Sequence, residues 1–193
     1  MIIHTDTTRF IYEVLEQGEY SFLFKNYSVL DVGCNIGAFS LYMQPMAKHI
    51  HAVDVSTECI EHFNDTIKDN KYENITTYSL AIAGKTGKRM VTRDGEPLSG
   101  GWRIDIPGDL EVDAYTLNDF MIINRIPHID VLKLDVEGAE AEIVQAKDFP
   151  RNKINTIIGE SHSVELLNQV NIALRSYGFT IFDVDGSHFL ARK

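Results

Sequence analysis

The chain has 193 residues, of which 44% are hydrophobic and 24% are charged, and its formal net charge is −10 at neutral pH. These values are typical of a globular protein and exclude a disordered chain, and the length suits one domain with a full hydrophobic core. The acidic balance argues against a nucleic-acid substrate, because phosphate backbones would be repelled unless a local basic face exists. No run of about 18 apolar residues is present, which excludes a membrane-spanning helix.

The N-terminal segment and the cysteines indicate a cellular setting. Residues 1–6 carry neither a basic start nor an apolar core, so they do not form a secretory signal. Cys34 and Cys59 are too few for a disulfide framework, and neither has a partner at metal-ligand spacing. We therefore expect reduced thiols and a cytoplasmic location.

Short apolar runs alternate with amphipathic stretches, which is the pattern of a parallel sheet covered by helices on both faces. No repeat or linker breaks this pattern, so we treat residues 1–193 as a single domain, with an N-terminal helix region at 1–27. The expected strands are 28–32, 50–55, 75–83, 129–134 and 154–159. The expected helices are 7–17, 36–46, 57–69, 117–124, 139–146 and 164–177.

Two segments depart from this alternation. Residues 85–114 are rich in glycine and proline, with short alternating runs between them, so we expect hairpins or a covering lid there. Near the C-terminus, an Asp-Gly pair at 185–186 separates the apolar runs 179–184 and 188–191, which predicts an antiparallel hairpin. The whole pattern predicts a three-layer, Rossmann-like α/β fold, in which a mainly parallel sheet ends in an antiparallel pair.

Residues 29–39 place a buried strand directly before a glycine turn that opens a helix. Gly33 can adopt a positive φ angle and lets the backbone approach a ligand, and Gly37 lets the first helical turn lie close to the strand or ligand. Turns of this kind bind nucleoside cofactors. A tight strand-to-helix turn with capping polar residues is the alternative.

The spacing within this turn separates two classes of cofactor. A dinucleotide fingerprint, Gly-x-Gly-x-x-Gly, would need glycines where the chain has Asn35 and Ala38. Asp31 places an anion beside the loop, which opposes a pyrophosphate but suits the ammonium and sulfonium groups of S-adenosylmethionine. Asp54 ends the next strand, at the usual distance for an acid that accepts hydrogen bonds from ribose hydroxyls.

A second acidic segment follows the strand at 129–134. Asp135 and Glu137 fall at the carboxyl end of this strand, where ligands bind in open α/β sheets. Two neighbouring carboxylates raise one another's pKa unless a cation, a metal or hydrogen-bond donors offset them. The alternative is that Asp135 caps the following helix and Glu140 belongs to its acidic first turn.

Two motifs together resemble the FkbM family of S-adenosylmethionine-dependent methyltransferases. They are Asp-Val-Gly-Cys-Asn-Ile-Gly at 31–37 and Leu-Lys-Leu-Asp-Val-Glu-Gly-Ala-Glu at 132–140. The segments 112–120 and 158–162 also resemble the family, and the likeness covers roughly residues 28–193.

The resemblance implies a class I methyltransferase fold and O-methylation of a hydroxyl group on a small metabolite, a sugar or a glycan. It also implies that Ala81, after the third strand, contacts the adenine of S-adenosylmethionine. The other expected cofactor contacts are Asp31, Gly33, Asn35, Gly37, Asp54 and Asp135.

Methyl transfer to an alkyl hydroxyl requires an oxygen held in line with the methyl carbon and relieved of its proton. Because such a hydroxyl is a poor acid, a base, a metal ion or both are needed. His162 is the candidate base, with Asp135 and Glu160 as catalytic acids beside it. A surface histidine at a helix start is the alternative. Asp135 and Glu160 also form a candidate Mg²⁺ pair, unless these acids orient substrate hydroxyls.

Glu137, Trp102 and Arg103 are the candidate substrate contacts, although a lone tryptophan commonly serves in packing. Two other functions stay open. An NAD-dependent oxidoreductase or epimerase is disfavoured by Asn35. A non-catalytic module that binds S-adenosylmethionine and serves a partner protein is disfavoured by the intact acids and glycines of both motifs.

Overall fold

The computed structural model describes residues 26–93, 102–104, 108–183 and 187–193. The helix expected at residues 7–17 lies outside this part of the chain. Among the described residues, no helix is long and apolar enough to cross a membrane.

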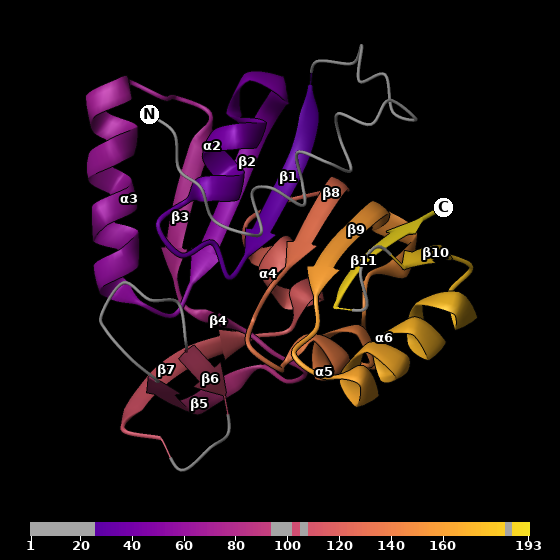
Figure 1. Ribbon diagram of the computed structural model, residues 1–193. Coiled ribbons are helices and arrows are strands. Elements are labelled where there is room, and N and C mark those ends of the chain that lie inside the picture. The colour runs from indigo at the N-terminus through magenta and orange to yellow at the C-terminus, as the bar shows by residue number, and fades with distance from the viewer. Residues whose placement is uncertain (1–25, 94–101, 105–107, 184–186) are drawn as a thin grey trace.

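Within the described residues, the larger sheet has seven strands in the order β10-β11-β9-β8-β1-β2-β3 (Figure 1). These strands are β1 (Tyr27–Val32), β2 (Ala47–Asp54), β3 (Ile75–Ser79), β8 (Ile129–Leu134), β9 (Ile154–Glu160), β10 (Thr180–Asp183) and β11 (His188–Arg192). Strands β1, β2, β3, β8 and β9 pair in parallel, whereas β11 pairs antiparallel with both β9 and β10. The predicted parallel sheet with a terminal antiparallel pair is therefore confirmed.

Helices cover both faces of this sheet, because alternate residues of each strand point to opposite sides. Val29 packs in one core with α2 (Ala38–Met43) and α3 (Thr57–Asn70). Leu30 packs in the other core, with the helices α4 (Leu117–Ile123), α5 (Glu140–Val144) and α6 (Val164–Ser176). The sequence expectation of a three-layer α/β architecture holds.

Side-chain caps fix where three of these helices begin. The hydroxyl of Ser56 accepts a hydrogen bond from the Cys59 N–H (3.2 Å) at the start of α3. Thr116 and Ser163 cap α4 and α6 in the same way. The helix expected at 36–46 is divided instead, since a separate 3₁₀ turn, η1 (Gln44–Met46), follows α2.

A smaller sheet has the strand order β4-β7-β5-β6 within the described residues and lies below the larger sheet in Figure 1. Its strands are β4 (Ala81–Ile82), β5 (Gly87–Arg93), β6 (Trp102–Ile104) and β7 (Leu110–Tyr115). Strand β5 pairs antiparallel with β6 and with β7, and β4 pairs in parallel with β7. The described parts of the glycine-rich segment thus form antiparallel strands.

The prediction of one continuous strand at 75–83 is wrong. Strand β3 ends at Ser79, and the N–H of Leu80 donates to the Asp54 carbonyl (3.0 Å) at the end of β2. Ala81 then pairs with Ala114 of the smaller sheet. The chain passes from the larger to the smaller sheet at Leu80, because the buried Ala81 pairs with β7. The periodicity of the local sequence does not predict this distant pairing.

Candidate cofactor and catalytic site

The turn between β1 and α2 contains glycine at two positions with left-handed backbone. Gly33 has a φ angle of 78°, and a Cβ atom there would lie 1.7 Å from the carbonyl oxygen of Asp135. Gly37 has a φ angle of 87°, and its Cβ atom would lie 2.3 Å from the Phe63 ring. The two glycines therefore let the turn pack directly against the end of β8 and against α3.

Asp54, the last residue of β2, is fixed by the same turn. Its Oδ2 atom accepts a hydrogen bond from the Asn35 N–H (2.8 Å), and its Oδ1 atom accepts one from the Ser56 N–H (2.8 Å). Burial raises the pKa of Asp54, although both hydrogen bonds act to lower it. The side-chain oxygen of Asn35 accepts from the Cys59 thiol (3.3 Å) instead. Asn35 thus positions the acid through its backbone.

A buried lysine links the two motifs, and sequence reasoning missed it. The Lys133 side chain is 6% exposed, and its Nζ atom donates to the Gly33 carbonyl (2.9 Å). The same Nζ atom lies 3.2 Å from Asp135 Oδ2 and 3.5 Å from Asp31 Oδ1. Burial acts to lower the pKa of Lys133, but the two carboxylates outweigh it and raise that pKa. A lysine flanked by Leu132 and Leu134 near the end of a doubly covered strand was the available signal.

Asp31, two residues before Gly33, is enclosed in the protein interior. Its carboxylate is fully buried, and Oδ2 accepts a hydrogen bond from the Ser40 hydroxyl (2.7 Å). Burial raises the pKa of Asp31, while Lys133 and Ser40 oppose the rise. Asp31 is not among the residues that line the cavity described below, and its expected place beside the cofactor stays a prediction.

Asp135, Glu137 and His162 come together beyond the end of β8. The Nε2 atom of His162 lies 3.7 Å from Asp135 Oδ1 and 3.4 Å from Glu137 Oε2. The nearby Asp135 carboxylate raises the pKa of His162 to about 9, with burial opposing and Glu137 assisting. At neutral pH the imidazole therefore carries a proton.

The two carboxylates of this group titrate in opposite directions. Burial acts to raise the pKa of Asp135, but Lys133 and His162 outweigh it and hold that pKa well below its usual range. Burial raises the pKa of Glu137, although the nearby imidazole of His162 opposes the rise. Asp135 is thus a permanent anion, and Glu137 is the more basic of the two.

Glu160 takes a different place from the one that the sequence suggested. It is paired with His188 across the β9–β11 ladder, and its Oε2 atom lies 3.4 Å from His188 Nε2. Among the described residues, the potential metal ligands within 4.8 Å of one another are Asp135, Glu137 and His162. The predicted Asp135–Glu160 pair is therefore corrected, since the strand register draws Glu160 toward β11.

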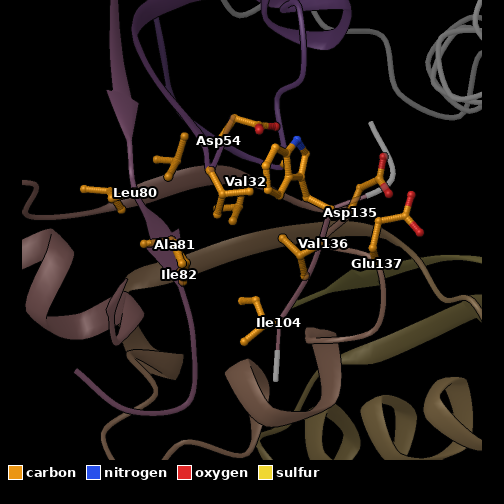
Figure 2. Close-up of a pocket in the computed structure, with 13 residues that line it drawn as sticks. Val32, Asp54, Leu80, Ala81, Ile82, Ile104, Asp135, Val136 and Glu137 are labelled. Carbon is orange, nitrogen blue, oxygen red and sulfur yellow. The ribbon is translucent and has the colours of Figure 1, made fainter. Parts of the chain in front are cut away.

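A cavity of about 40 Å³ lies between the strand ends and the smaller sheet. Gly33, Asp54, Ala81 and Asp135 line it, as expected for cofactor contacts, whereas Asn35 and Gly37 do not. Figure 2 shows Asp54 on one side of the cavity, Asp135 and Glu137 on a second side, and the apolar Ala81 and Ile82 across from them.

A second cavity of about 300 Å³ adjoins the first, and Ile104 and Glu137 line both. Arg103 borders this larger cavity, together with residues of α5 and α6. The three predicted substrate contacts are therefore divided, because Trp102 lines only the small cavity.

The comparison with known families decides the class of the protein. Residues 31–181 match the family described as the Methyltransferase FkbM domain. The chain belongs to the FkbM methyltransferase family. The resemblance carried by the two sequence motifs is thus confirmed.

Solved methyltransferases share the architecture of this FkbM domain. An FkbM methyltransferase from Methylobacillus flagellatus aligns with a TM-score of 0.60 at 14% identity, covering 91% of this chain and 46% of that one. A precorrin-6y C5,15-methyltransferase from Geobacter metallireducens aligns with a TM-score of 0.61 at 12% identity, covering 100% and 90%. At these identities the likeness establishes the fold alone.

One curated relative matches a short stretch of sequence. An uncharacterized RNA methyltransferase from Staphylococcus aureus is 41% identical over 58 residues. The match covers 30% of this chain and 13% of the relative, so the chain spans a small part of that protein's length.

Proposed function

We propose that the chain is an S-adenosylmethionine-dependent methyltransferase that modifies a hydroxyl group of a small metabolite, a sugar or a glycan. One observation carries the proposal. The acid at the end of β2, Asp54, and the acid after β8, Asp135, border the same cavity, and a larger cavity opens beside Asp135 and Glu137.

The residues of the small cavity match the chemistry of the cofactor. Asp54 offers carboxylate oxygens to ribose hydroxyls, and Ala81 and Ile82 offer an apolar surface to adenine. Asp135 stays ionised because Lys133 and His162 lower its pKa, and a fixed anion suits a sulfonium. When bound, S-adenosylmethionine supplies the electrophilic methyl group.

We assign His162 as the base that removes the proton from the acceptor hydroxyl. His162 is not among the residues that line either cavity, but its Nε2 atom lies 3.4 Å from Oε2 of Glu137, which lines both. A hydroxyl held by Glu137 would therefore lie near the imidazole. The pKa of about 9 means that the neutral, basic form of this imidazole grows as pH rises. A cationic cofactor near Asp135 would compete for the same negative charge and lower the pKa of His162 toward neutrality.

A divalent cation such as Mg²⁺ offers a second way to acidify the hydroxyl. The ligand atoms of Asp135, Glu137 and His162 lie close enough to share one ion. Full activity after prolonged chelation would leave the imidazole as the group that removes the proton. Loss of activity that is restored by added metal would assign the role to the ion.

RNA is the second candidate acceptor, on the strength of the local identity to an RNA methyltransferase. The net charge of −10 opposes this candidate, because binding to phosphate backbones depends on basic side chains.

The proposed acceptor class can be tested with labelled S-adenosylmethionine. We expect transfer of label to members of a panel of hydroxylated metabolites and glycosides, and none to total RNA. His162→Ala should abolish this transfer while leaving the affinity for S-adenosylhomocysteine unchanged. Label found in RNA alone would overturn the small-molecule acceptor, and a fully active His162→Ala variant would remove the imidazole from the mechanism.

A further inference from the structure

Strand β6 stands between the two cavities. Trp102 and Ile104 line the small cavity, and Arg103 and Ile104 line the large one. Strand β6 is three residues long and lies at the edge of the smaller sheet, where it pairs only with β5 among the described strands. A short edge strand has few ladder hydrogen bonds to lose, so it is the most easily displaced wall of the small cavity.

Trp102 forms part of this wall, but the hydrogen-bonding capacity of its indole N–H is not used. Its Nε1 atom is buried and has no hydrogen-bond partner among the residues that the structure describes. An unmade hydrogen bond of a buried donor costs about 1–3 kcal/mol, which weakens the closed arrangement. Above the ring, the Arg93 guanidinium lies 5.5 Å from the ring centroid, and Arg93 also lies 3.6 Å from Glu58 of α3.

The small cavity is narrow for the cofactor that its residues match. Its volume is about 40 Å³, whereas sites for cofactors and other small molecules commonly measure about 300–1,000 Å³. Trp102 has the largest side chain among the lining residues. The opposite walls are the ends of central strands, where Val32 and Val53 are almost fully buried and fixed by neighbours on both sides.

We propose that Trp102 occupies part of the cofactor site and that S-adenosylmethionine displaces it. The indole on β6 and the cofactor thus compete for the same space. The inference rests on the proposed cofactor, and it adds that binding includes the opening of β6. When the competent state is a minor fraction of the molecules, the apparent affinity falls by that fraction. Removing the indole should therefore tighten cofactor binding.

The chain has a single tryptophan, so its fluorescence reports on Trp102 alone. Titration of the full chain with S-adenosylhomocysteine should shift the emission to longer wavelength as the half-buried indole moves out into solvent. In parallel calorimetry, Trp102→Ala should bind S-adenosylhomocysteine roughly tenfold more tightly, which corresponds to a closed state favoured about ten to one. Met90→Ala serves as the control, because Met90 is an exposed residue of the neighbouring strand β5.

The outcomes separate this inference from the proposed function. If calorimetry detects no S-adenosylhomocysteine binding, the proposed cofactor is wrong. If the ligand binds but the emission does not shift, or Trp102→Ala binds no more tightly than the wild type, only the displacement of Trp102 is wrong. If Trp102→Ala does not fold, Trp102→Leu replaces it, and the wild-type emission titration decides without any variant.

Discussion

At the scale of single residues, Lys133 holds the site together. Its Nζ atom lies between the buried carboxylate of Asp31 and the half-buried carboxylate of Asp135, and it donates to the Gly33 carbonyl. Lys133→Met should destabilise the fold by about 3–5 kcal/mol, because one partner of a buried ion pair is removed and the anions remain. Urea unfolding would measure this loss.

A double variant, Asp31→Asn with Lys133→Met, separates the effect of charge at Lys133 from that of packing. Asp31→Asn removes one of the two anions that Lys133→Met leaves behind, so the double variant should recover part of the lost stability. Lys133→Met with wild-type stability would show that the lysine is dispensable.

His162 predicts a pH dependence of stability with a defined sign. Its folded-state pKa of about 9 lies above the ordinary value of 6.5, so its contribution is fully present below pH 6.5 and is lost as pH rises through 9. The difference in unfolding free energy between the wild type and His162→Gln should therefore be largest below pH 6.5 and vanish at alkaline pH. An NMR titration placing the pKa of His162 below 7 would contradict this.

At the scale of elements, the packing of the glycine turn against α3 depends on Gly37. Gly178 provides a matched control, since its φ angle of 86° is close to the 87° of Gly37, but a Cβ atom there would meet no described residue within 4 Å apart from its chain neighbours. Gly178→Ala should destabilise by about 1–2 kcal/mol through left-handed backbone alone. Gly37→Ala should destabilise clearly more, because its Cβ atom also meets the Phe63 ring. Equal losses in thermal or urea unfolding would show that the ring contact is unimportant.

The elements that sequence predicted best are those with strong local signals. The strand at 129–134 was predicted with its observed bounds, because a mainly apolar segment is followed by the acids Asp135 and Glu137. The turn after β1 was recognised because glycine spacing depends on backbone geometry within a few residues. The split of 75–83 into β3 and β4 was not predictable in this way, because it depends on a partner strand more than thirty residues away.

At the scale of the whole molecule, the site combines contacts that only the tertiary structure reveals. Glu160 could not be distinguished from Glu137 as the partner of Asp135, since the β9–β11 register that draws Glu160 to His188 is non-local. The role of Lys133 depends on the packing of β8 beside β1, which brings Asp31 close to it. The position of Trp102 depends on how the smaller sheet packs against the larger one. Family resemblance supplied the chemistry that the fold alone leaves open.

The central claim is that the small cavity bordered by Asp54 and Asp135 binds S-adenosylmethionine, and calorimetry tests this claim most directly. The wild-type chain should bind S-adenosylhomocysteine and not NAD. Asp54→Asn should weaken that binding roughly tenfold, as expected when hydrogen bonds to a charged acceptor are lost. Binding of NAD without S-adenosylhomocysteine would contradict the account.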